Sequence, residues 1–307
     1  MPGESVLFDH DGGLDDYLAL MLLLTLDQID LLGVIVTPAD CYIQPALGAT
    51  RKIMDLMGRS RIPVAESTVR GINPFPRAFR RSSFHVDHFP ILNRSDAIST
   101  PLAPETGQEF LVRVLREAVE PVTILETGPL TTVAAALVQA PDIVSKIRRI
   151  LWMGGALNVP GNVSHWIDGG QDMSMEWNVY WDPLSAHAVW QTAIPIVLCP
   201  LDITNHVKVT PAFVRQLGQR PQYPISELAG YCYALVMHQD YYCWDVLTTG
   251  YLARPDLFTT REWETVIVPT GASQGRTQVK PGGKRITALD TVDKEAFFAY
   301  LMQQWGR

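Results

Sequence analysis

The sequence comprises 307 residues, of which 47% are hydrophobic, and its formal net charge is −7 at pH 7. A chain of this length can bury a large core, either as one large α/β domain or as two smaller domains. The acidic balance, together with the absence of a long basic run, argues against nucleic acid or an anionic membrane as a partner.

Short apolar runs alternate with helix-like segments over most of the chain. The runs predict buried strands at residues 5–9, 31–37, 62–66, 122–128, 148–155 and 194–204. Helices are predicted between them at residues 15–28, 44–58, 106–119, 130–139 and 182–192. Such alternation predicts a parallel sheet with helices on both faces. We therefore expect an α/β fold of Rossmann-like type, with one domain at residues 1–307 and a central, mostly parallel sheet flanked by helices.

Two segments depart from this alternation. Residues 70–104 are rich in Pro, Arg and Ser but also carry aromatic residues, so we expect a long excursion close to the functional site. After residue 210 the pattern becomes mainly helical, with strands expected at 263–269 and 285–290 before a closing helix.

Polar residues collect where the predicted strands end. Asp9 and Asp11 fall at the end of the first strand, and Asp40 lies just past the end of the second. Thr127 closes the fourth strand, and Met153 lies at the end of the fifth. Ligands of parallel α/β sheets bind beyond the carboxyl ends of the strands, so these residues are expected to converge on one edge.

The stretch "DHDGGLDD" places four carboxylates, Asp9, Asp11, Asp15 and Asp16, within eight positions. Carboxylates this close repel one another and are pushed toward protonation unless a cation lies among them. Ligation by oxygen alone favours a hard ion such as Ca²⁺ or Mg²⁺ over zinc. In an alternative interpretation Asp15 and Asp16 only stabilise the start of the first helix, which leaves Asp9 and Asp11 unexplained.

Other motifs fit less well. An EF-hand loop starting at Asp9 fails because its ligand positions are occupied by Gly13 and Leu20. The stretch "GASQG" at 271–275 matches a nucleophile elbow, but no helical pattern follows it and no His lies downstream. A phosphatase that begins with DxDG remains an alternative, although that pattern has no place for the adjacent pair Asp15 and Asp16.

The opening motif resembles D-x-D-x-x-x-D-D of the inosine-uridine-preferring nucleoside hydrolases. Further stretches fit the same family in the same order over nearly the whole chain: "ETGPLT" (126–131), "WMGGA" (152–156), "GNV" (161–163), "MEWNVYWDP" (175–183), "LDITN" (201–205) and "WD" (244–245). The resemblance is nearest to the purine-preferring inosine-adenosine-guanosine type, through "DHDGGLDD", "NPFPRAF" (73–79) and "YYCWD" (241–245). It implies the nucleoside hydrolase fold.

The resemblance also implies roles for individual residues. Ca²⁺ would be held by the side chains of Asp11, Asp16 and Asp245 and by the main-chain carbonyl of Thr127, with Asp11 also acting as the catalytic base. The residues implied around the ribose are Asp15, Asp40, Met153, Asn162, Glu176 and Asn178. Those around the base are Phe79, Trp244 and Tyr241. Asp9 is expected to support the metal ligands from behind.

The implied reaction is Ca²⁺-dependent hydrolysis of the N-glycosidic bond of purine ribonucleosides, through an oxocarbenium-like transition state and a metal-activated water. Stacking between Trp244 and Phe79 would favour the protonated purine. Phe79 departs from the purine type, which has Trp there, and Trp244 replaces the His of pyrimidine-accepting members. A broad-specificity or pyrimidine hydrolase, the phosphatase, and a non-catalytic nucleoside-binding protein remain alternatives.

The location and assembly of the protein can also be anticipated. The N-terminus has no basic start or cleavage site, and the longest apolar run, residues 18–26, is too short to span a bilayer. The four cysteines are widely spaced and show no metal-binding pattern, which is typical of reduced, buried thiols. We therefore expect a cytoplasmic protein without a membrane partner, and a homo-oligomer that is a dimer or a tetramer.

Overall fold

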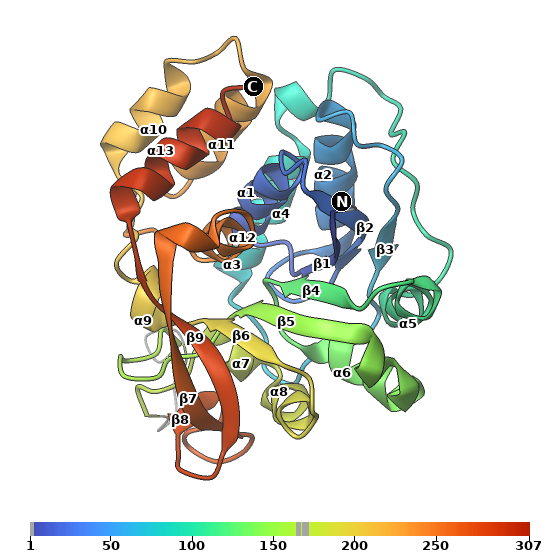
Figure 1. The fold of residues 1–307 in the computed structure, drawn as a ribbon. Coiled ribbons are helices and arrows are strands. Elements are labelled where there is room, and N and C mark those ends of the chain that lie inside the picture. The colour runs from blue at the N-terminus through green and yellow to red at the C-terminus, as the bar shows by residue number, and fades with distance from the viewer. Residues whose placement is uncertain (1–2, 164–166, 168–171) are drawn as a thin grey trace.

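The computed structural model describes residues 3–163, 167 and 172–307. Its centre is one sheet with the strand order β3-β2-β1-β4-β5-β6-β9-β7-β8 (Figure 1). The strands of the parallel part are β1 (Glu4–His10), β2 (Ile29–Val36), β3 (Val64–Glu66), β4 (Val122–Glu126), β5 (Ile147–Met153) and β6 (Ile196–Cys199). Neighbours among these six pair in parallel, which confirms the predicted parallel sheet.

The C-terminal part of the sheet is antiparallel. The strand β9 (Lys284–Val292) pairs in parallel with β6, whereas β7 (Phe258–Val268) is antiparallel to both β9 and β8 (Arg276–Val279). The sheet is therefore mostly parallel and carries an antiparallel extension at one edge.

Helices cover both faces of the sheet (Figure 1). One apolar layer joins Val6 and Phe8 of β1 to helices α1 (Leu14–Leu23), α2 (Ile43–Leu56), α11 (Pro224–Ala234), α12 (Asp245–Ala253) and α13 (Lys294–Gln304). The other joins Leu7 to helices α5 (Gly107–Glu117), α6 (Thr131–Gln139) and α8 (Pro183–Trp190). Successive side chains of a strand point to opposite faces, so the continuous apolar run of β1 supplies both layers.

The remaining elements are short or lie at the rim of the sheet. They are the helices α3 (Arg77–Arg80), α4 (Ser82–Asp87), α7 (Trp177–Trp181), α9 (Leu201–Thr204) and α10 (Pro211–Gly218), and the 3-10 helices η1 (Pro90–Leu92), η2 (Pro141–Lys146) and η3 (Pro255–Leu257). Within the described ranges, no helix has both the length and the apolar character needed to cross a bilayer.

The structure corrects three boundaries. The strand predicted at 194–204 ends at Cys199, because Pro200 precedes the short helix α9. The helix predicted at 182–192 is preceded by α7, and Asp182 separates the two because its side chain accepts the backbone N–H of Ser185. The strand β8 was not predicted, since its four residues alternate in polarity too briefly to stand out, and "GASQG" forms the turn before it.

Candidate active site

The carboxyl ends of the parallel strands bring the predicted acids to one edge. Asp9 lies in β1 directly opposite Glu126 of β4, and the backbone N–H of Thr127 donates to the carbonyl of Asp9 at 3.0 Å. The parallel pairing of β1 with β2 and β4 thus aligns the ends of three strands. The convergence expected from the sequence is present in the structure.

A glycine turn folds the acids around the start of α1. Gly12 has φ +75°, and a Cβ atom there would lie 2.7 Å from the Cβ of Cys41, so both the backbone and the space require glycine. A Cβ on Gly13 would lie 3.0 Å from an oxygen of Asp40, 3.3 Å from one of Asp16 and 3.6 Å from one of Asp11. Three carboxylates therefore surround a single point beside Gly13.

Asp16 is fixed on both of its oxygens. It accepts the backbone N–H of Gly13 at 2.7 Å and the hydroxyl of Thr127 at 2.5 Å. The first contact stabilises the start of α1, as the alternative interpretation of Asp16 requires, and the second ties that helix to the end of β4. Burial and the neighbouring charge of Asp11 raise the pKa of Asp16 well above its usual range.

The remaining acids join this cluster from a distance in sequence. Asp245 is the first residue of α12, which packs on α1, and only 4% of it is exposed. Burial and the charge of Asp15 raise the pKa of Asp245 well above its usual range. Burial and the charge of Asp40 do the same to the pKa of Asp11. The carboxylates of this cluster therefore repel one another, as expected for acids that need a cation.

Asp9 lies behind the cluster and is fully buried. The hydroxyl of Thr37 donates to its carboxylate at 2.8 Å, and Thr37 is linked through Thr132 to Ser67 by contacts of 2.7 Å. Burial raises the pKa of Asp9 to about 8. The analysis of the sequence did not single out these hydroxyls or Glu126, although Thr37 and Ser67 directly follow β2 and β3 and Glu126 ends β4.

Asn178 and Glu176 organise the opposite wall. The amide of Asn178 donates to the carbonyl oxygens of Thr127 at 2.9 Å and Met153 at 3.1 Å, which joins the ends of β4 and β5. The carboxylate of Glu176 accepts the backbone N–H groups of Gly155 and Asn178. These bonds show structural roles for both residues, whereas their contacts with a sugar remain a prediction.

Asn162 lies on the same wall. Its side-chain oxygen accepts the backbone N–H of Trp177 at 3.1 Å, and its own N–H donates to the carbonyl of Met175. The loop that carries Asn162 is thereby fixed to the start of α7.

The aromatic residues predicted around the base lie in two separate clusters. Trp244 packs against the cluster of Met153, Ala156 and Leu201 and meets the ring of Tyr241 edge to face, with centroids 4.7 Å apart. Phe79 packs with Phe75 and Trp177 instead, and its ring meets Trp177 edge to face at 5.9 Å. The proposed sandwich between Trp244 and Phe79 therefore remains a prediction.

Tyr241 was predicted to contact the base. In the structure its hydroxyl donates to the carboxylate of Asp15 at 3.1 Å. This bond connects the predicted base side of the site to the predicted ribose side.

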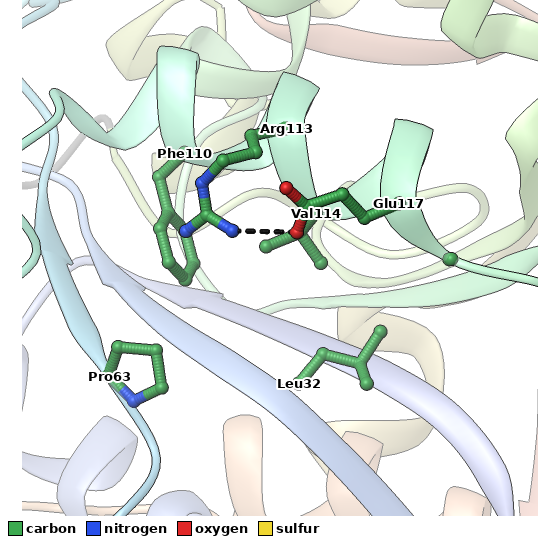
Figure 2. Close-up of a pocket in the computed structure, with 7 residues that line it drawn as sticks. Leu32, Pro63, Phe110, Arg113, Val114 and Glu117 are labelled. Atoms are coloured by element: carbon green, nitrogen blue, oxygen red, sulfur yellow. Dashed lines mark hydrogen bonds and ion pairs between the residues drawn. The ribbon is translucent and has the colours of Figure 1, made fainter.

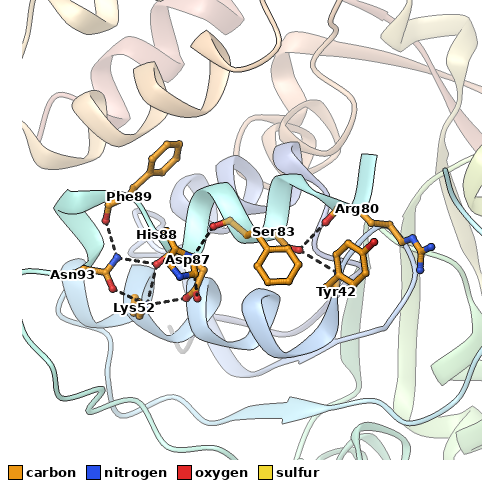
Figure 3. A network of polar contacts seen from close by, with 9 residues as sticks. Tyr42, Lys52, Arg80, Ser83, Asp87, His88, Phe89 and Asn93 are labelled. Carbon is orange, nitrogen blue, oxygen red and sulfur yellow. Dashed lines mark hydrogen bonds and ion pairs between the residues drawn. The ribbon is translucent and has the colours of Figure 1, made fainter. Parts of the chain in front are cut away.

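The excursion at residues 70–104 brings α3 to this edge and fixes it through α4. Figure 3 shows that the hydroxyl of Ser83 donates to the carbonyl of Arg80 and accepts the N–H of Tyr42, while Lys52 of α2 binds Asp87 at 2.8 Å. The guanidinium of Arg80 lies 5.1 Å from the centre of the Tyr42 ring. Its charge opposes the rise that burial causes in the pKa of Asp40. Arg80 is a further residue that the sequence did not single out.

The donors suit a hard divalent cation.

Results

Sequence analysis

The sequence comprises 307 residues, of which 47% are hydrophobic, and its formal net charge is −7 at pH 7. A chain of this length can bury a large core, either as one large α/β domain or as two smaller domains. The acidic balance, together with the absence of a long basic run, argues against nucleic acid or an anionic membrane as a partner.

Short apolar runs alternate with helix-like segments over most of the chain. The runs predict buried strands at residues 5–9, 31–37, 62–66, 122–128, 148–155 and 194–204. Helices are predicted between them at residues 15–28, 44–58, 106–119, 130–139 and 182–192. Such alternation predicts a parallel sheet with helices on both faces. We therefore expect an α/β fold of Rossmann-like type, with one domain at residues 1–307 and a central, mostly parallel sheet flanked by helices.

Two segments depart from this alternation. Residues 70–104 are rich in Pro, Arg and Ser but also carry aromatic residues, so we expect a long excursion close to the functional site. After residue 210 the pattern becomes mainly helical, with strands expected at 263–269 and 285–290 before a closing helix.

Polar residues collect where the predicted strands end. Asp9 and Asp11 fall at the end of the first strand, and Asp40 lies just past the end of the second. Thr127 closes the fourth strand, and Met153 lies at the end of the fifth. Ligands of parallel α/β sheets bind beyond the carboxyl ends of the strands, so these residues are expected to converge on one edge.

The stretch "DHDGGLDD" places four carboxylates, Asp9, Asp11, Asp15 and Asp16, within eight positions. Carboxylates this close repel one another and are pushed toward protonation unless a cation lies among them. Ligation by oxygen alone favours a hard ion such as Ca²⁺ or Mg²⁺ over zinc. In an alternative interpretation Asp15 and Asp16 only stabilise the start of the first helix, which leaves Asp9 and Asp11 unexplained.

Other motifs fit less well. An EF-hand loop starting at Asp9 fails because its ligand positions are occupied by Gly13 and Leu20. The stretch "GASQG" at 271–275 matches a nucleophile elbow, but no helical pattern follows it and no His lies downstream. A phosphatase that begins with DxDG remains an alternative, although that pattern has no place for the adjacent pair Asp15 and Asp16.

The opening motif resembles D-x-D-x-x-x-D-D of the inosine-uridine-preferring nucleoside hydrolases. Further stretches fit the same family in the same order over nearly the whole chain: "ETGPLT" (126–131), "WMGGA" (152–156), "GNV" (161–163), "MEWNVYWDP" (175–183), "LDITN" (201–205) and "WD" (244–245). The resemblance is nearest to the purine-preferring inosine-adenosine-guanosine type, through "DHDGGLDD", "NPFPRAF" (73–79) and "YYCWD" (241–245). It implies the nucleoside hydrolase fold.

The resemblance also implies roles for individual residues. Ca²⁺ would be held by the side chains of Asp11, Asp16 and Asp245 and by the main-chain carbonyl of Thr127, with Asp11 also acting as the catalytic base. The residues implied around the ribose are Asp15, Asp40, Met153, Asn162, Glu176 and Asn178. Those around the base are Phe79, Trp244 and Tyr241. Asp9 is expected to support the metal ligands from behind.

The implied reaction is Ca²⁺-dependent hydrolysis of the N-glycosidic bond of purine ribonucleosides, through an oxocarbenium-like transition state and a metal-activated water. Stacking between Trp244 and Phe79 would favour the protonated purine. Phe79 departs from the purine type, which has Trp there, and Trp244 replaces the His of pyrimidine-accepting members. A broad-specificity or pyrimidine hydrolase, the phosphatase, and a non-catalytic nucleoside-binding protein remain alternatives.

The location and assembly of the protein can also be anticipated. The N-terminus has no basic start or cleavage site, and the longest apolar run, residues 18–26, is too short to span a bilayer. The four cysteines are widely spaced and show no metal-binding pattern, which is typical of reduced, buried thiols. We therefore expect a cytoplasmic protein without a membrane partner, and a homo-oligomer that is a dimer or a tetramer.

Overall fold

The computed structural model describes residues 3–163, 167 and 172–307. Its centre is one sheet with the strand order β3-β2-β1-β4-β5-β6-β9-β7-β8 (Figure 1). The strands of the parallel part are β1 (Glu4–His10), β2 (Ile29–Val36), β3 (Val64–Glu66), β4 (Val122–Glu126), β5 (Ile147–Met153) and β6 (Ile196–Cys199). Neighbours among these strands pair in parallel, which confirms the predicted parallel sheet.

The C-terminal part of the sheet is antiparallel. The strand β9 (Lys284–Val292) pairs in parallel with β6, whereas β7 (Phe258–Val268) is antiparallel to both β9 and β8 (Arg276–Val279). The sheet is therefore mostly parallel and carries an antiparallel extension at one edge.

Helices cover both faces of the sheet (Figure 1). One apolar layer joins Val6 and Phe8 of β1 to helices α1 (Leu14–Leu23), α2 (Ile43–Leu56), α11 (Pro224–Ala234), α12 (Asp245–Ala253) and α13 (Lys294–Gln304). The other joins Leu7 to helices α5 (Gly107–Glu117), α6 (Thr131–Gln139) and α8 (Pro183–Trp190). Successive side chains of a strand point to opposite faces, so the continuous apolar run of β1 supplies both layers.

The remaining elements are short or lie at the rim of the sheet. They are the helices α3 (Arg77–Arg80), α4 (Ser82–Asp87), α7 (Trp177–Trp181), α9 (Leu201–Thr204) and α10 (Pro211–Gly218), and the 3-10 helices η1 (Pro90–Leu92), η2 (Pro141–Lys146) and η3 (Pro255–Leu257). Within the described ranges, no helix has both the length and the apolar character needed to cross a bilayer.

The structure corrects three of the predicted elements. The strand predicted at 194–204 ends at Cys199, because Pro200 precedes the short helix α9. The helix predicted at 182–192 is preceded by α7, and Asp182 separates the two because its side chain accepts the backbone N–H of Ser185. The strand β8 was not predicted, since its few residues alternate in polarity too briefly to stand out, and "GASQG" forms the turn before it.

Candidate active site

The carboxyl ends of the parallel strands bring the predicted acids to one edge. Asp9 lies in β1 directly opposite Glu126 of β4, and the backbone N–H of Thr127 donates to the carbonyl of Asp9 at 3.0 Å. The parallel pairing of β1 with β2 and β4 thus aligns the ends of these strands. The convergence expected from the sequence is present in the structure.

A glycine turn folds the acids around the start of α1. Gly12 has φ +75°, and a Cβ atom there would lie 2.7 Å from the Cβ of Cys41, so both the backbone and the space require glycine. A Cβ on Gly13 would lie 3.0 Å from an oxygen of Asp40, 3.3 Å from one of Asp16 and 3.6 Å from one of Asp11. These carboxylates therefore surround a single point beside Gly13.

Asp16 is fixed on both of its oxygens. It accepts the backbone N–H of Gly13 at 2.7 Å and the hydroxyl of Thr127 at 2.5 Å. The first contact stabilises the start of α1, as the alternative interpretation of Asp16 proposed, and the second ties that helix to the end of β4. Burial and the neighbouring charge of Asp11 raise the pKa of Asp16 well above its usual range.

Asp245 joins this cluster from a distant part of the sequence. It is the first residue of α12, which packs on α1, and only 4% of it is exposed. Burial and the charge of Asp15 raise the pKa of Asp245 well above its usual range. Burial and the charge of Asp40 do the same to the pKa of Asp11. The carboxylates of this cluster therefore repel one another, as expected for acids that need a cation.

Asp9 lies behind the cluster and is fully buried. The hydroxyl of Thr37 donates to its carboxylate at 2.8 Å, and Thr37 is linked through Thr132 to Ser67 by contacts of 2.7 Å. Burial raises the pKa of Asp9 to about 8. The sequence analysis did not single out these hydroxyls or Glu126, although Thr37 and Ser67 directly follow β2 and β3 and Glu126 ends β4.

Asn178 and Glu176 organise the opposite wall. The amide of Asn178 donates to the carbonyl oxygens of Thr127 at 2.9 Å and Met153 at 3.1 Å, which joins the ends of β4 and β5. The carboxylate of Glu176 accepts the backbone N–H groups of Gly155 and Asn178. These bonds show structural roles for both residues, whereas their contacts with a sugar remain a prediction.

Asn162 lies on the same wall. Its side-chain oxygen accepts the backbone N–H of Trp177 at 3.1 Å, and its own N–H donates to the carbonyl of Met175. These bonds fix the loop that carries Asn162 to the start of α7.

The aromatic residues predicted around the base lie in two separate clusters. Trp244 packs against the cluster of Met153, Ala156 and Leu201. Phe79 packs with Phe75 and Trp177 instead, and its ring meets that of Trp177 edge to face with the centroids 5.9 Å apart. The sandwich of a purine between Trp244 and Phe79 therefore remains a prediction.

Tyr241 was predicted to contact the base. In the structure its hydroxyl donates to the carboxylate of Asp15 at 3.1 Å. Its ring meets that of Trp244 edge to face, with the centroids 4.7 Å apart. Tyr241 therefore connects the predicted ribose side of the site to the predicted base side.

The excursion at residues 70–104 contains α3, which α4 fixes to the body of the protein. Figure 3 shows that the hydroxyl of Ser83 donates to the carbonyl of Arg80 and accepts the N–H of Tyr42. In the same network, Lys52 of α2 binds Asp87 at 2.8 Å.

Arg80 is a further residue that the sequence analysis did not single out. Its guanidinium lies 5.1 Å from the centre of the Tyr42 ring. Burial raises the pKa of Asp40, and the charge of Arg80 opposes that rise. The only sequence signal was its position next to Phe79 in an arginine-rich stretch.

The oxygen atoms at this edge are of the kind that a hard divalent cation prefers as ligands. Asp11, Asp16 and Asp245 are buried acids whose pKa values are raised mainly by that burial, and the carbonyl of Thr127 adds another oxygen. Across the described part of the chain, no three His, Cys, Asp or Glu side chains already form a cage of metal ligands. The residues therefore fit a cation by their type and burial.

A separate hollow lies away from these acids. Its volume is about 210 Å³, and its lining includes Leu32, Pro63 and Phe110. Arg113 and Glu117, which also line it, form an ion pair at 2.8 Å (Figure 2). It lies against β2 and α5 and contains none of the predicted site residues. The acidic edge of the sheet, rather than this cavity, is the candidate active site.

Known proteins are similar to this chain in fold and in sequence. Residues 6–299 match the family model described as inosine-uridine preferring nucleoside hydrolase. The crystal structure of an inosine-uridine preferring nucleoside hydrolase from Bacillus anthracis is 40% identical, with a TM-score of 0.95 and 99% of each chain covered. A pyrimidine-specific ribonucleoside hydrolase RihA from Klebsiella pneumoniae (strain 342) is 31% identical over 97% of each chain. The fold is shared by a purine-preferring ribonucleoside hydrolase from Gardnerella vaginalis, with a TM-score of 0.82. That protein is 22% identical, and the match covers 99% of this chain and 98% of that one.

Proposed function

The chain belongs to the inosine-uridine preferring nucleoside hydrolase family, and we propose that it hydrolyses the N-glycosidic bond of purine ribonucleosides to free base and ribose. Membership makes it a hydrolase acting on N-glycosyl compounds. The observation that carries the purine assignment is the position of Trp244. This large aromatic residue directly precedes the buried acid Asp245 and packs beside Met153.

Cleavage of an N-glycosidic bond develops positive charge on the ribose ring. The carboxylates of Asp11, Asp15 and Asp40 would stabilise that charge more than they stabilise the neutral substrate, which is what accelerates the reaction. Asp15 and Asn178 would hold the ribose hydroxyls, because both are already oriented by bonds to the protein. Orientation before binding lowers the entropic cost of reaching the transition state.

Asp11 is our candidate for the general base. It would take a proton from a water molecule as that water adds to C1 of the ribose, while the bond from C1 to the base nitrogen breaks. The backbone of Gly128 packs closely against Asp11, since a Cβ on Gly128 would lie 2.8 Å from the Cβ of Asp11. The leaving base departs with its bonding electron pair and must gain a proton.

Members of this family are typically metal-dependent, and we propose Ca²⁺ as the ion. Asp11, Asp16, Asp245 and the carbonyl of Thr127 would hold it. When bound, such an ion lowers the pKa of a coordinated water and fixes the geometry of the sugar hydroxyls.

Aromatic stacking would assist the leaving base. A purine lying on the face of Trp244 would be favoured in its protonated, cationic form by interaction with the electron-rich ring. We propose that Phe79 closes the other side of the base, which requires α3 to approach Trp244 when substrate binds.

A pyrimidine nucleoside hydrolase is the second candidate. It is favoured by the relatives named pyrimidine-specific ribonucleoside hydrolase RihA, which are 30% to 31% identical and match nearly the whole chain. The same acids would serve either reaction, since the ribose is common to both substrates. The two candidates therefore differ only at the base.

A substrate comparison separates the candidates. We would measure kcat/KM for inosine, adenosine, guanosine, uridine and cytidine with Ca²⁺ present, beside Asp11→Ala as a control. A preference for the purines supports the proposal, and uridine or cytidine as the best substrate overturns it. No base release from any nucleoside, with full activity on p-nitrophenyl phosphate, would indicate the phosphatase alternative.

We further propose that the protein is a cytoplasmic homo-oligomer that acts in purine salvage. Sedimentation velocity of the purified chain tests the oligomeric state, and a monomer at all concentrations would contradict it.

A further inference from the structure

The hydrogen bond between Tyr241 and Asp15 joins residues that are 226 positions apart. Asp15 lies in the first turn of α1, among the acids of the site. The Tyr241 hydroxyl lies 3.1 Å from Oδ1 of Asp15 and donates to it. A hydroxyl has one proton, so while it serves Asp15 it cannot also protonate the leaving base.

The position of Tyr241 is fixed by its surroundings. The residue is 7% exposed, and its ring lies edge to face between those of Tyr233 and Trp244, with centroid distances of 6.4 and 4.7 Å. Its carbonyl accepts the N–H of Val209 at 2.9 Å, and the N–H of Cys243 donates to Val207 at 2.9 Å. The backbone around Tyr241 is therefore fixed by hydrogen bonds to Val207 and Val209, and this fixes the position of the hydroxyl beside Asp15.

A neutral donor is suited to this place. Asp15 lies beside other acids, and an arginine or lysine there would stabilise it with a full positive charge. Such a charge would also oppose the positive charge that develops on the ribose ring. A hydroxyl orients the carboxylate without adding any charge, and its single proton is directed at Oδ1.

We propose that Tyr241 is a positioning residue that orients Asp15 toward the ribose 2-hydroxyl and thereby sets the preference for ribonucleosides over 2-deoxyribonucleosides. This inference rests on the proposed function, because it assigns Asp15 to the sugar. Tyr241 acts through Asp15 rather than by contact with the base.

The test is a comparison of Tyr241→Phe with the wild-type protein, using inosine and 2-deoxyinosine. We expect kcat/KM for inosine to fall about tenfold, the loss typical of a hydrogen bond to a charged group. The value for 2-deoxyinosine should stay within about twofold, since that substrate lacks the hydroxyl that Asp15 binds. A merely structural role of Tyr241 would lower both values equally, and that result would overturn the proposal.

Tyr242→Phe is the matched control. It removes the same hydroxyl from the next residue, whose ring also lies against Trp244, with centroids 5.8 Å apart. It should leave the ratio of the two substrates unchanged. A shift in this ratio equal to that of Tyr241→Phe would also contradict the proposal.

A double variant supplies a second measurement. If Tyr241 acts through Asp15, Asp15→Asn with Tyr241→Phe should be no less active than Asp15→Asn alone. Additive losses would overturn the inference. A wild-type protein that hydrolyses no nucleoside would instead reject the proposed function, so the two failures are distinguishable.

Discussion

The side-chain amide of Asn178 donates a hydrogen bond to the main-chain carbonyl oxygen of Thr127 at 2.9 Å, and another to the carbonyl of Met153 at 3.1 Å. Asn178 lies in α7, whereas the two carbonyls follow β4 and end β5. One buried side chain therefore sets the spacing of two strand ends and orients a carbonyl that is expected to face the cation.

Asn178→Ala should lower both stability and activity. The change removes the donor for two buried carbonyl oxygens, so we expect a loss of about 1–3 kcal/mol in the free energy of unfolding. We also expect a fall in kcat/KM, because Asn178 is proposed to contact the ribose. Chemical denaturation and steady-state kinetics measure the two effects. Asn205→Ala, at an exposed amide, should leave both unchanged, and an unaltered Asn178 variant would contradict the assignment.

Gly12→Ala should destabilise the acidic turn. A left-handed backbone costs a non-glycine residue about 1–2 kcal/mol, and here the new Cβ would also overlap Cys41. Gly58→Ala is the matched control, since Gly58 has φ +68° but its Cβ would have nothing within 4 Å. The Gly12 variant should melt at a clearly lower temperature than the Gly58 variant. Equal melting temperatures would show that the contact with Cys41 relaxes without cost.

Removal of divalent cations should abolish activity, and Ca²⁺ should restore it. Ca²⁺ at one hundred times its dissociation constant should also stabilise the wild-type protein by about 2.7 kcal/mol, because only the folded chain assembles the site. Differential scanning calorimetry measures this gain. This gain should be lost in Asp245→Asn and kept in Asp30→Asn, which changes an exposed acid near the start of β2, at the strand end opposite the site. Full activity in excess chelator would reject the metal.

Trp244→Ala should separate stacking from packing. If the ring activates the leaving base, kcat for inosine should fall far more than kcat for p-nitrophenyl riboside, whose leaving group needs no proton. Equal losses on both substrates would mean that Trp244 only packs against Met153. Trp263→Ala, in strand β7 of the antiparallel extension of the sheet, is the control and should change neither rate.

Much of the fold could be predicted because local patterns encode it. The alternation of apolar runs and helical segments predicted β1 to β6 and the parallel sheet, since buried parallel strands are apolar on both faces. The pattern failed where it was short or mixed. The strand β8 carries only a few residues of alternating polarity, and Pro200 ends β6 before an apolar stretch that forms a helix instead.

The sequence by itself determined the family, through several stretches that match it in order. It also determined that the acids of "DHDGGLDD" lie close together, because residues so near in sequence cannot be far apart in space. Only the tertiary structure decided which distant groups meet that turn. Tyr241 reaches Asp15, Asn178 reaches Thr127, and α12 places Asp245 beside α1. These contacts depend on how helices pack on the sheet, and no local pattern encodes which residue, far away along the chain, a side chain will meet.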